Sequence, residues 1–340
     1  MRAALGVGVV AMLLTLALVL AIVFLRLRLR WRERRWDRFV ETWRPALLAA
    51  MLGGARPAVL PVLRANEHVL FLRLWTYLQE SVRGDAARVL NETAMHLRLD
   101  ATARTLLRRG SRTEKLQATL AAGYLRDIAA WDMLVALARG RDSLLSVHAA
   151  RALVRINPLR AANGLMPLLL ARTDWDLARV AGFLGEARHA FWLLMAKVIP
   201  RVKPADLPRA LLLAEALRLQ LPDATVARLL APGQSPAVLQ AALRLAEAPP
   251  LGAAVRACLD HADAGVREQA ALQLARLAGP DDIPVLGRLL DDPEWPVRMA
   301  AARSLARLPY LSTEELEGLG ELHPGAAPVL RHVLAERRMG

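Results

Sequence analysis

The chain of 340 residues contains a single cysteine, Cys258. One thiol excludes a disulfide framework or a multi-thiolate metal site within the chain, and it is typical of a reducing compartment. Aromatic residues account for only 5% of the chain, and extended runs of Val, Ile and Thr are missing, whereas Ala and Leu are abundant. This composition predicts an all-α protein. Because Cys258 stands among apolar residues, we expect a buried and inert thiol.

Sequence motifs for catalysis are missing as well. None of the three lysines stands in a G-x-x-x-x-G-K phosphate loop, and neither an H-E-x-x-H metal motif nor a G-x-S-x-G nucleophile motif occurs. Metal sites built into repeats would place His beside Glu or Asp at regular spacing, and the histidines do not recur in that way. We therefore predict that the protein is not an enzyme and has no metal site and no cofactor. The seven histidines are His68, His96, His148, His189, His261, His323 and His332.

Charge is missing from residues 3–25, AALGVGVVAMLLTLALVLAIVFL. At about 1.5 Å per residue, this stretch forms a helix of about 35 Å, which would cross a hydrocarbon core of about 30 Å with some tilt. A cleaved secretory signal is the alternative, but its apolar stretch is shorter, and no A-x-A motif separates Leu25 from Arg26 here. The sequence therefore predicts a retained transmembrane anchor over residues 1–25.

Positive charge returns directly after the apolar run. The first 44 residues hold nine arginines and three acidic residues, so they supply six of the fourteen net positive charges of the chain. Because Lys and Arg remain on the cytoplasmic side and only Arg2 precedes the run, we expect a single-pass protein of the inner membrane, with its N-terminus outside. Segment 26–56 is predicted to contact anionic lipid headgroups. The predicted membrane-surface residues are Arg26, Arg28, Arg30, Arg32, Arg34, Arg35 and Arg38.

A repeat of about 30 residues fills the C-terminal part of the chain. LDHADAGVREQAALQLARL from Leu259 aligns without a gap with LDDPEWPVRMAAARSLARL from Leu290, at an offset of 31 residues. Such self-similarity indicates stacked helical hairpins, because one hairpin cannot bury its apolar face alone. Plausible first helices begin with DIPVLGRLL from Asp282 and with PLRAANGLMPLLL from Pro158. Small residues in the second helices would let adjacent hairpins pack closely.

These segments resemble the HEAT-repeat family, whose units often read V-R-x-x-A-A-x-A-L-G-x-L. The pairs Val266-Arg267 and Val297-Arg298 match the opening of this pattern, and the resemblance is specific over roughly residues 113–308. It implies an α-solenoid, as in an N-terminally membrane-anchored bacterial member of the family.

The resemblance also implies a domain organisation. We expect the anchor and the basic segment to be followed by a HEAT-like solenoid over 57–340, with seven or eight hairpins and a C-terminal capping helix. The phase of the repeats between 57 and 112 stays open. Ser312, followed three residues later by Glu315, predicts a capping box near the C-terminal end.

Three arginines occupy the same position of aligned repeats. Stacking would place Arg155, Arg276 and Arg307 in a row, which would suit an acidic peptide, phosphates or lipid headgroups. A solvent-facing position in a basic protein is the simpler interpretation of this row.

Tryptophans offer a second candidate feature. Trp31 and Trp36 stand among the juxtamembrane arginines, whereas Trp43 is expected to pack on the folded domain. Trp175 and Trp295 precede second helices, where exposed rings would be candidate partner contacts. Packing between adjacent hairpins is the favoured interpretation for this pair.

Anchor and repeats together predict a membrane-tethered scaffold or adaptor. Its solenoid would bind a protein partner at the cytoplasmic face of the inner membrane, and a membrane enzyme complex is a reasonable partner. Two other function classes stay open. Some HEAT-like families are bilin lyases or DNA glycosylases, so the resemblance also admits an enzyme. A basic chain could instead tether nucleic acid at the membrane. This is the less favoured interpretation, because an anchor would hold the arginines beside the anionic lipid surface.

Overall fold

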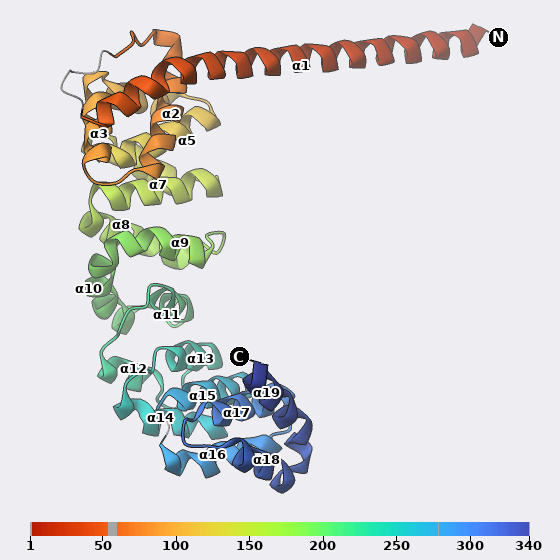
Figure 1. The fold of residues 1–340 in the computed structure, drawn as a ribbon, viewed down its shortest axis with the longest axis vertical. Coiled ribbons are helices and arrows are strands. Elements are labelled where there is room, and N and C mark those ends of the chain that lie inside the picture. The colour runs from red at the N-terminus through yellow and green to blue at the C-terminus, as the bar shows by residue number, and fades with distance from the viewer. Residues whose placement is uncertain (1, 54–59, 278, 340) are drawn as a thin grey trace. The chain divides into compact units, whose positions relative to one another are not determined.

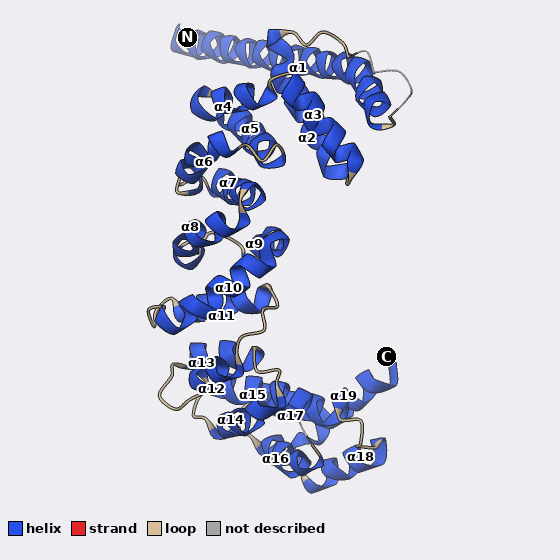
Figure 2. Ribbon diagram, turned by 90° about the vertical axis from the view of Figure 1, so that its left-hand side faces the viewer, coloured by secondary structure: helices blue, strands red, loops and turns tan. Residues whose placement is uncertain are grey.

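The chain is described by a computed structural model that covers residues 2–53, 60–277 and 279–339 (Figures 1 and 2). Among these residues all regular secondary structure is helical, which confirms the predicted all-α fold. Side chains are described for Leu16 and for residues 18–337, apart from the same gaps. The chain divides into two compact units, 1–156 and 157–340, and each is described by itself.

The first unit contains seven α-helices among its described residues. Helix α1 packs against α2 and α3, α2 packs against α5, and α5 packs against both α4 and α7. The pairs α4/α5 and α6/α7 are therefore stacked hairpins of the predicted kind. The bounds are α1 Arg2–Met51, α2 His68–Ser81, α3 Asp85–His96, α4 Leu99–Arg109, α5 Arg112–Tyr124, α6 Trp131–Ala138 and α7 Ser143–Ile156.

Within the described part of the chain, no helix has both the length and the apolar character needed to span a bilayer. The anchor predicted over 1–25 falls mainly outside the described side chains, which exclude residues 1–15 and 17. The described apolar residues of α1 that follow are uncovered, each 43 to 64% exposed. We call them the exposed apolar belt; they are Leu16, Leu18, Val19, Leu20, Ile22, Val23, Phe24, Leu25, Leu27, Leu29 and Trp31.

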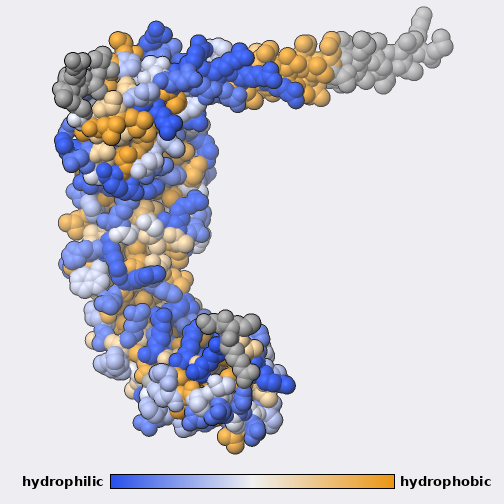
Figure 3. All heavy atoms as spheres, viewed as in Figure 1, coloured by the Kyte–Doolittle hydropathy of each residue, from blue (hydrophilic) through white to orange (hydrophobic). Residues whose placement is uncertain are grey.

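Helix α1 continues from this belt into the folded unit without interruption. Phe39, Trp43 and Leu47 are buried, and the rings of Trp43 and Phe71 lie nearly perpendicular with centroids 4.8 Å apart. The expected packing of Trp43 on the folded domain is thus confirmed. In Figure 3 the described surface of α1 changes from apolar to hydrophilic toward this packed end.

Helices α5 and α7 approach each other closely at Gly123. A Cβ added to Gly123 would lie 3.0 Å from both the Cα and the Cβ of Ala152. Both atoms belong to a buried helix, so neither neighbour retreats easily. Gly123 is therefore a packing requirement of this hairpin stack.

We expect Gly123→Ala to lower the free energy of unfolding by about 1 to 3 kcal/mol through overpacking, although Ala favours helix by about 1 kcal/mol. Gly164 in α8 is the matched control, because a Cβ there would meet nothing within 4 Å. Gly164→Ala should therefore stabilise by up to about 1 kcal/mol. Urea unfolding followed by circular dichroism measures both changes. A Gly123→Ala chain as stable as the parent would contradict the close packing.

The second unit contains twelve α-helices among its described residues. The second helices α11, α13, α15, α17 and α19 pack side by side in chain order, and each of α12, α14, α16 and α18 packs on the helix that follows it (Figure 1). The bounds are α8 Pro158–Ala171, α9 Leu177–Leu184, α10 Arg188–Val198, α11 Leu207–Ala216, α12 Asp223–Leu229, α13 Pro236–Arg244, α14 Gly252–Ala257, α15 Ala264–Leu277, α16 Ile283–Arg288, α17 Trp295–Arg307, α18 Thr313–Leu322 and α19 Ala327–Met339.

Small residues lie where the second helices meet, as predicted. Two alanines of α15 and two of α17 have no exposed surface, so the two helices approach closely, and the leucines that follow fill the same layer. These residues are Ala270, Ala271, Ala301, Ala302, Leu274 and Leu305.

The number of hairpins differs from the expectation. The described residues after α1 contain eighteen α-helices, enough for nine pairs in chain order rather than seven or eight, and within this series α8 packs on α10 and α9 on α11. Two features account for the difference. The stretch 57–112 contributes three helices, and α12, α14 and α16 have only seven, six and six residues, so that each repeat takes up little chain.

The predicted capping box is present at the start of α18. Ser312 Oγ accepts from the N–H of Glu315 at 3.1 Å, and the Glu315 carboxylate accepts from the N–H of Ser312 at 2.7 Å. The bond from the Ser312 N–H, together with the Ser312 hydroxyl, holds the pKa of the Glu315 carboxyl below its usual value. The last hairpin, α18/α19, thus begins at a well-defined residue.

Candidate binding groove

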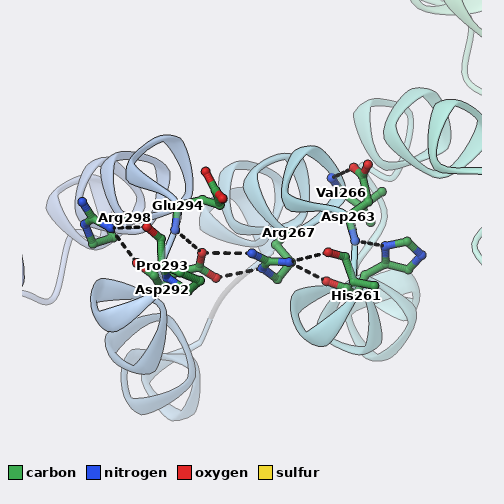
Figure 4. Close-up of polar contacts among 9 residues, drawn as sticks. His261, Asp263, Val266, Arg267, Asp292, Pro293, Glu294 and Arg298 are labelled. Carbon is green, nitrogen blue, oxygen red and sulfur yellow. Dashed lines mark hydrogen bonds and ion pairs between the residues drawn. The ribbon is translucent and has the colours of Figure 1, made fainter.

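A largely buried ion pair joins two repeats of the second unit (Figure 4). Arg267 at the start of α15 donates from Nε and Nη2 to the two carboxylate oxygens of Asp292, at 2.8 and 3.0 Å. Its Nη1 donates to the carbonyl oxygens of His261 and Ala262 in its own repeat, at 2.8 and 2.9 Å. Asp292 is 6% and Arg267 13% exposed. One guanidinium therefore fixes two consecutive interhelical turns.

The following repeat lacks the equivalent ion pair among its described residues. Arg298 donates to the carbonyl oxygens of Asp292 and Pro293 at 2.7 and 2.9 Å, but its buried Nε has no partner among the described residues. The position equivalent to Asp292, 31 residues later, is His323, which pairs with Asp291 at 2.6 Å instead. Figure 4 shows Arg298 turned toward its own turn.

A second set of ion pairs connects successive first helices. Arg256 of α14 donates to both oxygens of Asp282 at 2.5 and 3.0 Å, and Asp282 also accepts from the N–H of Gly279 at 2.9 Å. The Arg256 guanidinium outweighs the opposing effect of burial and holds the pKa of Asp282 below its usual value. In the first unit, Arg104 and Asp127 form the equivalent pair at 2.6 Å.

Two adjoining hollows of about 850 and 600 Å³ open beside the ends of α11, α13, α15 and α17. They share Glu215, Arg244 and Arg276, so they form one continuous surface in the second unit. We call this surface the arginine groove. Its charged lining residues are Arg188, Arg218, Arg244, Arg276, Arg303, Arg307, Glu215, Asp223, Glu247 and Glu336.

Helix electrostatics explains part of this accumulation of arginines. Arg244, Arg276 and Arg307 each lie in the last turn of a second helix, where the partial negative charge of the carbonyl end favours a cation. Stacking of the second helices then brings these three ends to one side of the unit. The preference for arginine at the end of each second helix thus produces a cationic surface.

The arginines of the groove are unequally paired. Arg244 binds Glu215 at 2.8 Å and Arg303 binds Glu336 at 3.0 Å, whereas Arg276 and Glu247 are 3.8 Å apart. The Arg303 guanidinium lowers the pKa of the Glu336 carboxyl below its usual value. With six arginines against four acidic residues, the groove carries an excess of two positive charges.

Three guanidinium groups line the groove without a carboxylate partner among the described residues: those of Arg188, Arg218 and Arg307. Arg188 donates to the carbonyl oxygen of Arg218 instead. Arg218 has a φ of 50°, in the left-handed region, two residues after the end of α11. The side chains of Arg218 and Arg307 are therefore the ones most available to an added carboxylate or phosphate.

The residues of the predicted arginine row belong to two units. Arg276 and Arg307 line the same hollow. Arg155 belongs to the first unit, where its guanidinium lies over the ring of Tyr124, 4.2 Å from the centroid. The sequence comparison missed Arg303, although its spacing of four residues from Arg307 on one helix places both on one face.

The two candidate tryptophans differ. Trp175 is 1% exposed, which confirms the packing interpretation for this residue, whereas Trp295 is 55% exposed at the start of α17. The predicted membrane-surface arginines, Arg26 to Arg38, lie on α1; Arg35 is half-buried and the others are exposed.

Reactive groups are few in this unit. The Cys258 thiol is buried, and burial raises its pKa, as expected of an inert thiol. No group of three or more His, Cys, Asp or Glu side chains within the described residues has the arrangement of a metal site.

Comparison with known proteins identifies HEAT repeats in this unit. The family profile for HEAT repeats matches residues 224–306 and 252–338, which include α13, α15, α17 and most of the arginine groove. The helical solenoid inferred from the sequence is supported over this range. No curated protein sequence matches the chain.

Proposed function

We propose that the chain is a non-enzymatic scaffold whose arginine groove binds an acidic segment of a protein partner. HEAT repeats form helical scaffolds able to mediate protein interaction, and the matched repeats carry most of this groove. The observation that favours an acidic ligand is the pair Arg218 and Arg307, which face the groove without a carboxylate partner among the described residues.

A carboxylate-rich segment fits the groove for two physical reasons. An incoming Asp or Glu would neutralise the excess charge, and arginine binds carboxylates through two parallel hydrogen bonds. The weak pair between Arg276 and Glu247, at 3.8 Å and largely exposed, is easily exchanged for a partner's carboxylate. The existing internal pairs keep the other guanidinium groups in fixed positions, which lowers the entropic cost of binding.

We also propose that the chain is tethered to the cytoplasmic face of the inner membrane by the N-terminal part of α1. Support comes from the exposed apolar belt, which no described residue covers, and from the arginines and Trp31 that follow it. A tethered scaffold meets a membrane-associated partner at a raised local concentration.

Charge reversal in the groove tests the scaffold. We expect Arg276→Glu/Arg307→Glu to weaken binding of a fluorescent poly-glutamate peptide to the full chain in mild detergent by at least tenfold, because charge-assisted hydrogen bonds are lost. The matched control is Arg228→Glu/Arg288→Glu. These two exposed arginines also lie in last helical turns of the same unit, but on first helices. Fluorescence anisotropy at 150 mM salt, an ionic strength near the physiological value, measures both.

The control separates a defined site from general electrostatics. An equal loss in both double variants would contradict the groove. Duplex DNA serves as the competing ligand: binding to DNA in preference to the peptide, with a steep loss on raising the salt concentration, would favour a nucleic-acid binder instead. Affinity purification from membranes with the same variants then identifies the natural partner.

A further inference from the structure

A separate hollow of about 590 Å³ lies in the first unit, between α1 and the segment that leads into α2. Arg35 and Arg38 of α1 line it, together with Arg64 from the incoming segment. Glu67 is the one acidic residue in the described lining. Three guanidinium groups from two separate parts of the chain thus surround one space.

These guanidinium groups are little used by the protein itself. Arg35 donates one hydrogen bond to the carbonyl of Asn66 at 2.6 Å, and its guanidinium lies over the ring of Trp31, 5.7 Å from the centroid. Arg38 donates one hydrogen bond to the carbonyl of Arg34 at 3.2 Å. The backbone of Arg64 bonds to Glu67: its N–H donates to the Glu67 carboxylate at 3.1 Å, and its carbonyl accepts from the Glu67 N–H at 2.9 Å. A guanidinium has five N–H donors, so most donors around the hollow are left for a ligand.

The lining suits an anion such as a phosphate. Its three arginines and one glutamate carry two net positive charges, and no described carboxylate forms an ion pair with any of the three guanidinium groups. A tetrahedral phosphate has enough oxygens to accept from more than one of these guanidinium groups at once.

Apolar residues also line this hollow. Trp31 is 59% and Val62 87% exposed, and both belong to its lining. A free phosphate gains nothing from such neighbours, whereas a phospholipid brings acyl chains and a glycerol beside its phosphate. The hollow therefore suits an amphipathic phosphate ester.

We propose that this hollow binds the phosphate of one anionic phospholipid. The inference rests on the proposed membrane tether, because Arg35 follows Leu25 by ten residues, roughly 15 Å along α1. Helical side chains lean toward the N-terminus, so Arg35 and Arg38 lean toward the headgroup layer of the tethering membrane. The site fixes one lipid in a defined place, in addition to the diffuse attraction of the neighbouring arginines.

Lipid titration of the full chain in a zwitterionic detergent tests the site. Native mass spectrometry counts bound phosphatidylglycerol, with phosphatidylcholine and glycerol 3-phosphate as the other probes. We expect one phosphatidylglycerol per chain and at least a tenfold lower affinity in Arg64→Gln. Arg30→Gln is the matched control, because Arg30 is an exposed arginine of α1 outside the hollow; it should change the affinity less than threefold.

The following results would overturn the assignment of the hollow to a phospholipid phosphate. Equal losses in Arg64→Gln and Arg30→Gln would show diffuse attraction instead of a site. Glycerol 3-phosphate binding as tightly as phosphatidylglycerol would show a site for soluble phosphates. Sedimentation with vesicles of phosphatidylcholine alone reports the tether separately, since that lipid carries no net charge. A chain that does not sediment there lacks the tether, and the lipid assignment falls with it.

Discussion

Asp292→Ala is expected to lower the free energy of unfolding of the second unit by about 3 to 5 kcal/mol. The change removes both hydrogen bonds from Arg267 and leaves its guanidinium buried without a counter-charge, although two carbonyl bonds remain. The N–H of Glu294 also loses its acceptor. Asp292→Asn should cost less, because the amide oxygen still accepts one of these bonds.

Hydrogen exchange of the α15 and α17 amides measures this effect in the second unit alone. The control is Glu247→Ala in the same unit, which removes an exposed pair with Arg276, the two side chains being 61% and 65% exposed. Such a surface pair contributes at most about 1 kcal/mol. An Asp292→Ala chain that loses no more stability than this control would contradict the account of the buried pair.

The same pair has a pH dependence of known sign. Burial alone would raise the pKa of the Asp292 carboxyl. Its hydrogen bonds with Arg267 and with the N–H of Glu294 lower the pKa by more than burial raises it, so the folded pKa lies below the usual value. A depressed folded pKa means that the pair stabilises the unit at neutral pH. That contribution begins to fall as the pH approaches the unfolded value of about 3.9, and it is lost below the folded pKa.

The sequence predicts the repeats well because their signals are local. Periodic apolar residues, buried alanines and the capping box at Ser312 each depend on neighbours within a few residues. The first helices could be placed for the same reason, and α8 begins at Pro158 as predicted. The count of hairpins was less predictable, since helices of six residues give almost no periodicity.

The groove was predictable only in part. Arg276 and Arg307 share a repeat position, so alignment found them. Arg244 and Arg218 do not share it, and they reach the same surface because adjacent helix ends converge there. Arg155 follows the pattern but lies in the other unit. A repeat position therefore predicts which way a side chain faces, and the fold decides which neighbours it meets.

The phosphate hollow could not be predicted from the sequence. Arg35 and Arg64 are far apart in the chain, and Arg64 follows a segment without a repeat signature. Only the packing of α1 on α2 and α3 brings their surroundings together. The sequence indicates only a basic segment over 26–56. In the structure, Arg35 and Arg38 of this segment line one hollow together with Arg64, which lies outside it.

The central claim is that the N-terminal part of α1 holds the chain on a membrane, and deletion of residues 2–25 tests it. The described residues in this range, Leu16 and 18–25, are exposed, so their removal leaves the fold intact. A deletion that reached residue 44 would also remove Phe39 and Trp43, expose Phe71 and cause aggregation that resembles membrane binding. The shorter deletion is therefore the informative one.

Fractionation of cells in carbonate at high pH, followed by immunodetection, is the most direct measurement. We expect nearly all of the full chain in the membrane pellet, because a spanning helix is not extracted by salt or alkali. The chain without residues 2–25 should move to the supernatant, with residual vesicle binding through Leu27, Leu29 and the arginines that disappears in high salt. Extraction of the full chain by carbonate would contradict the tether.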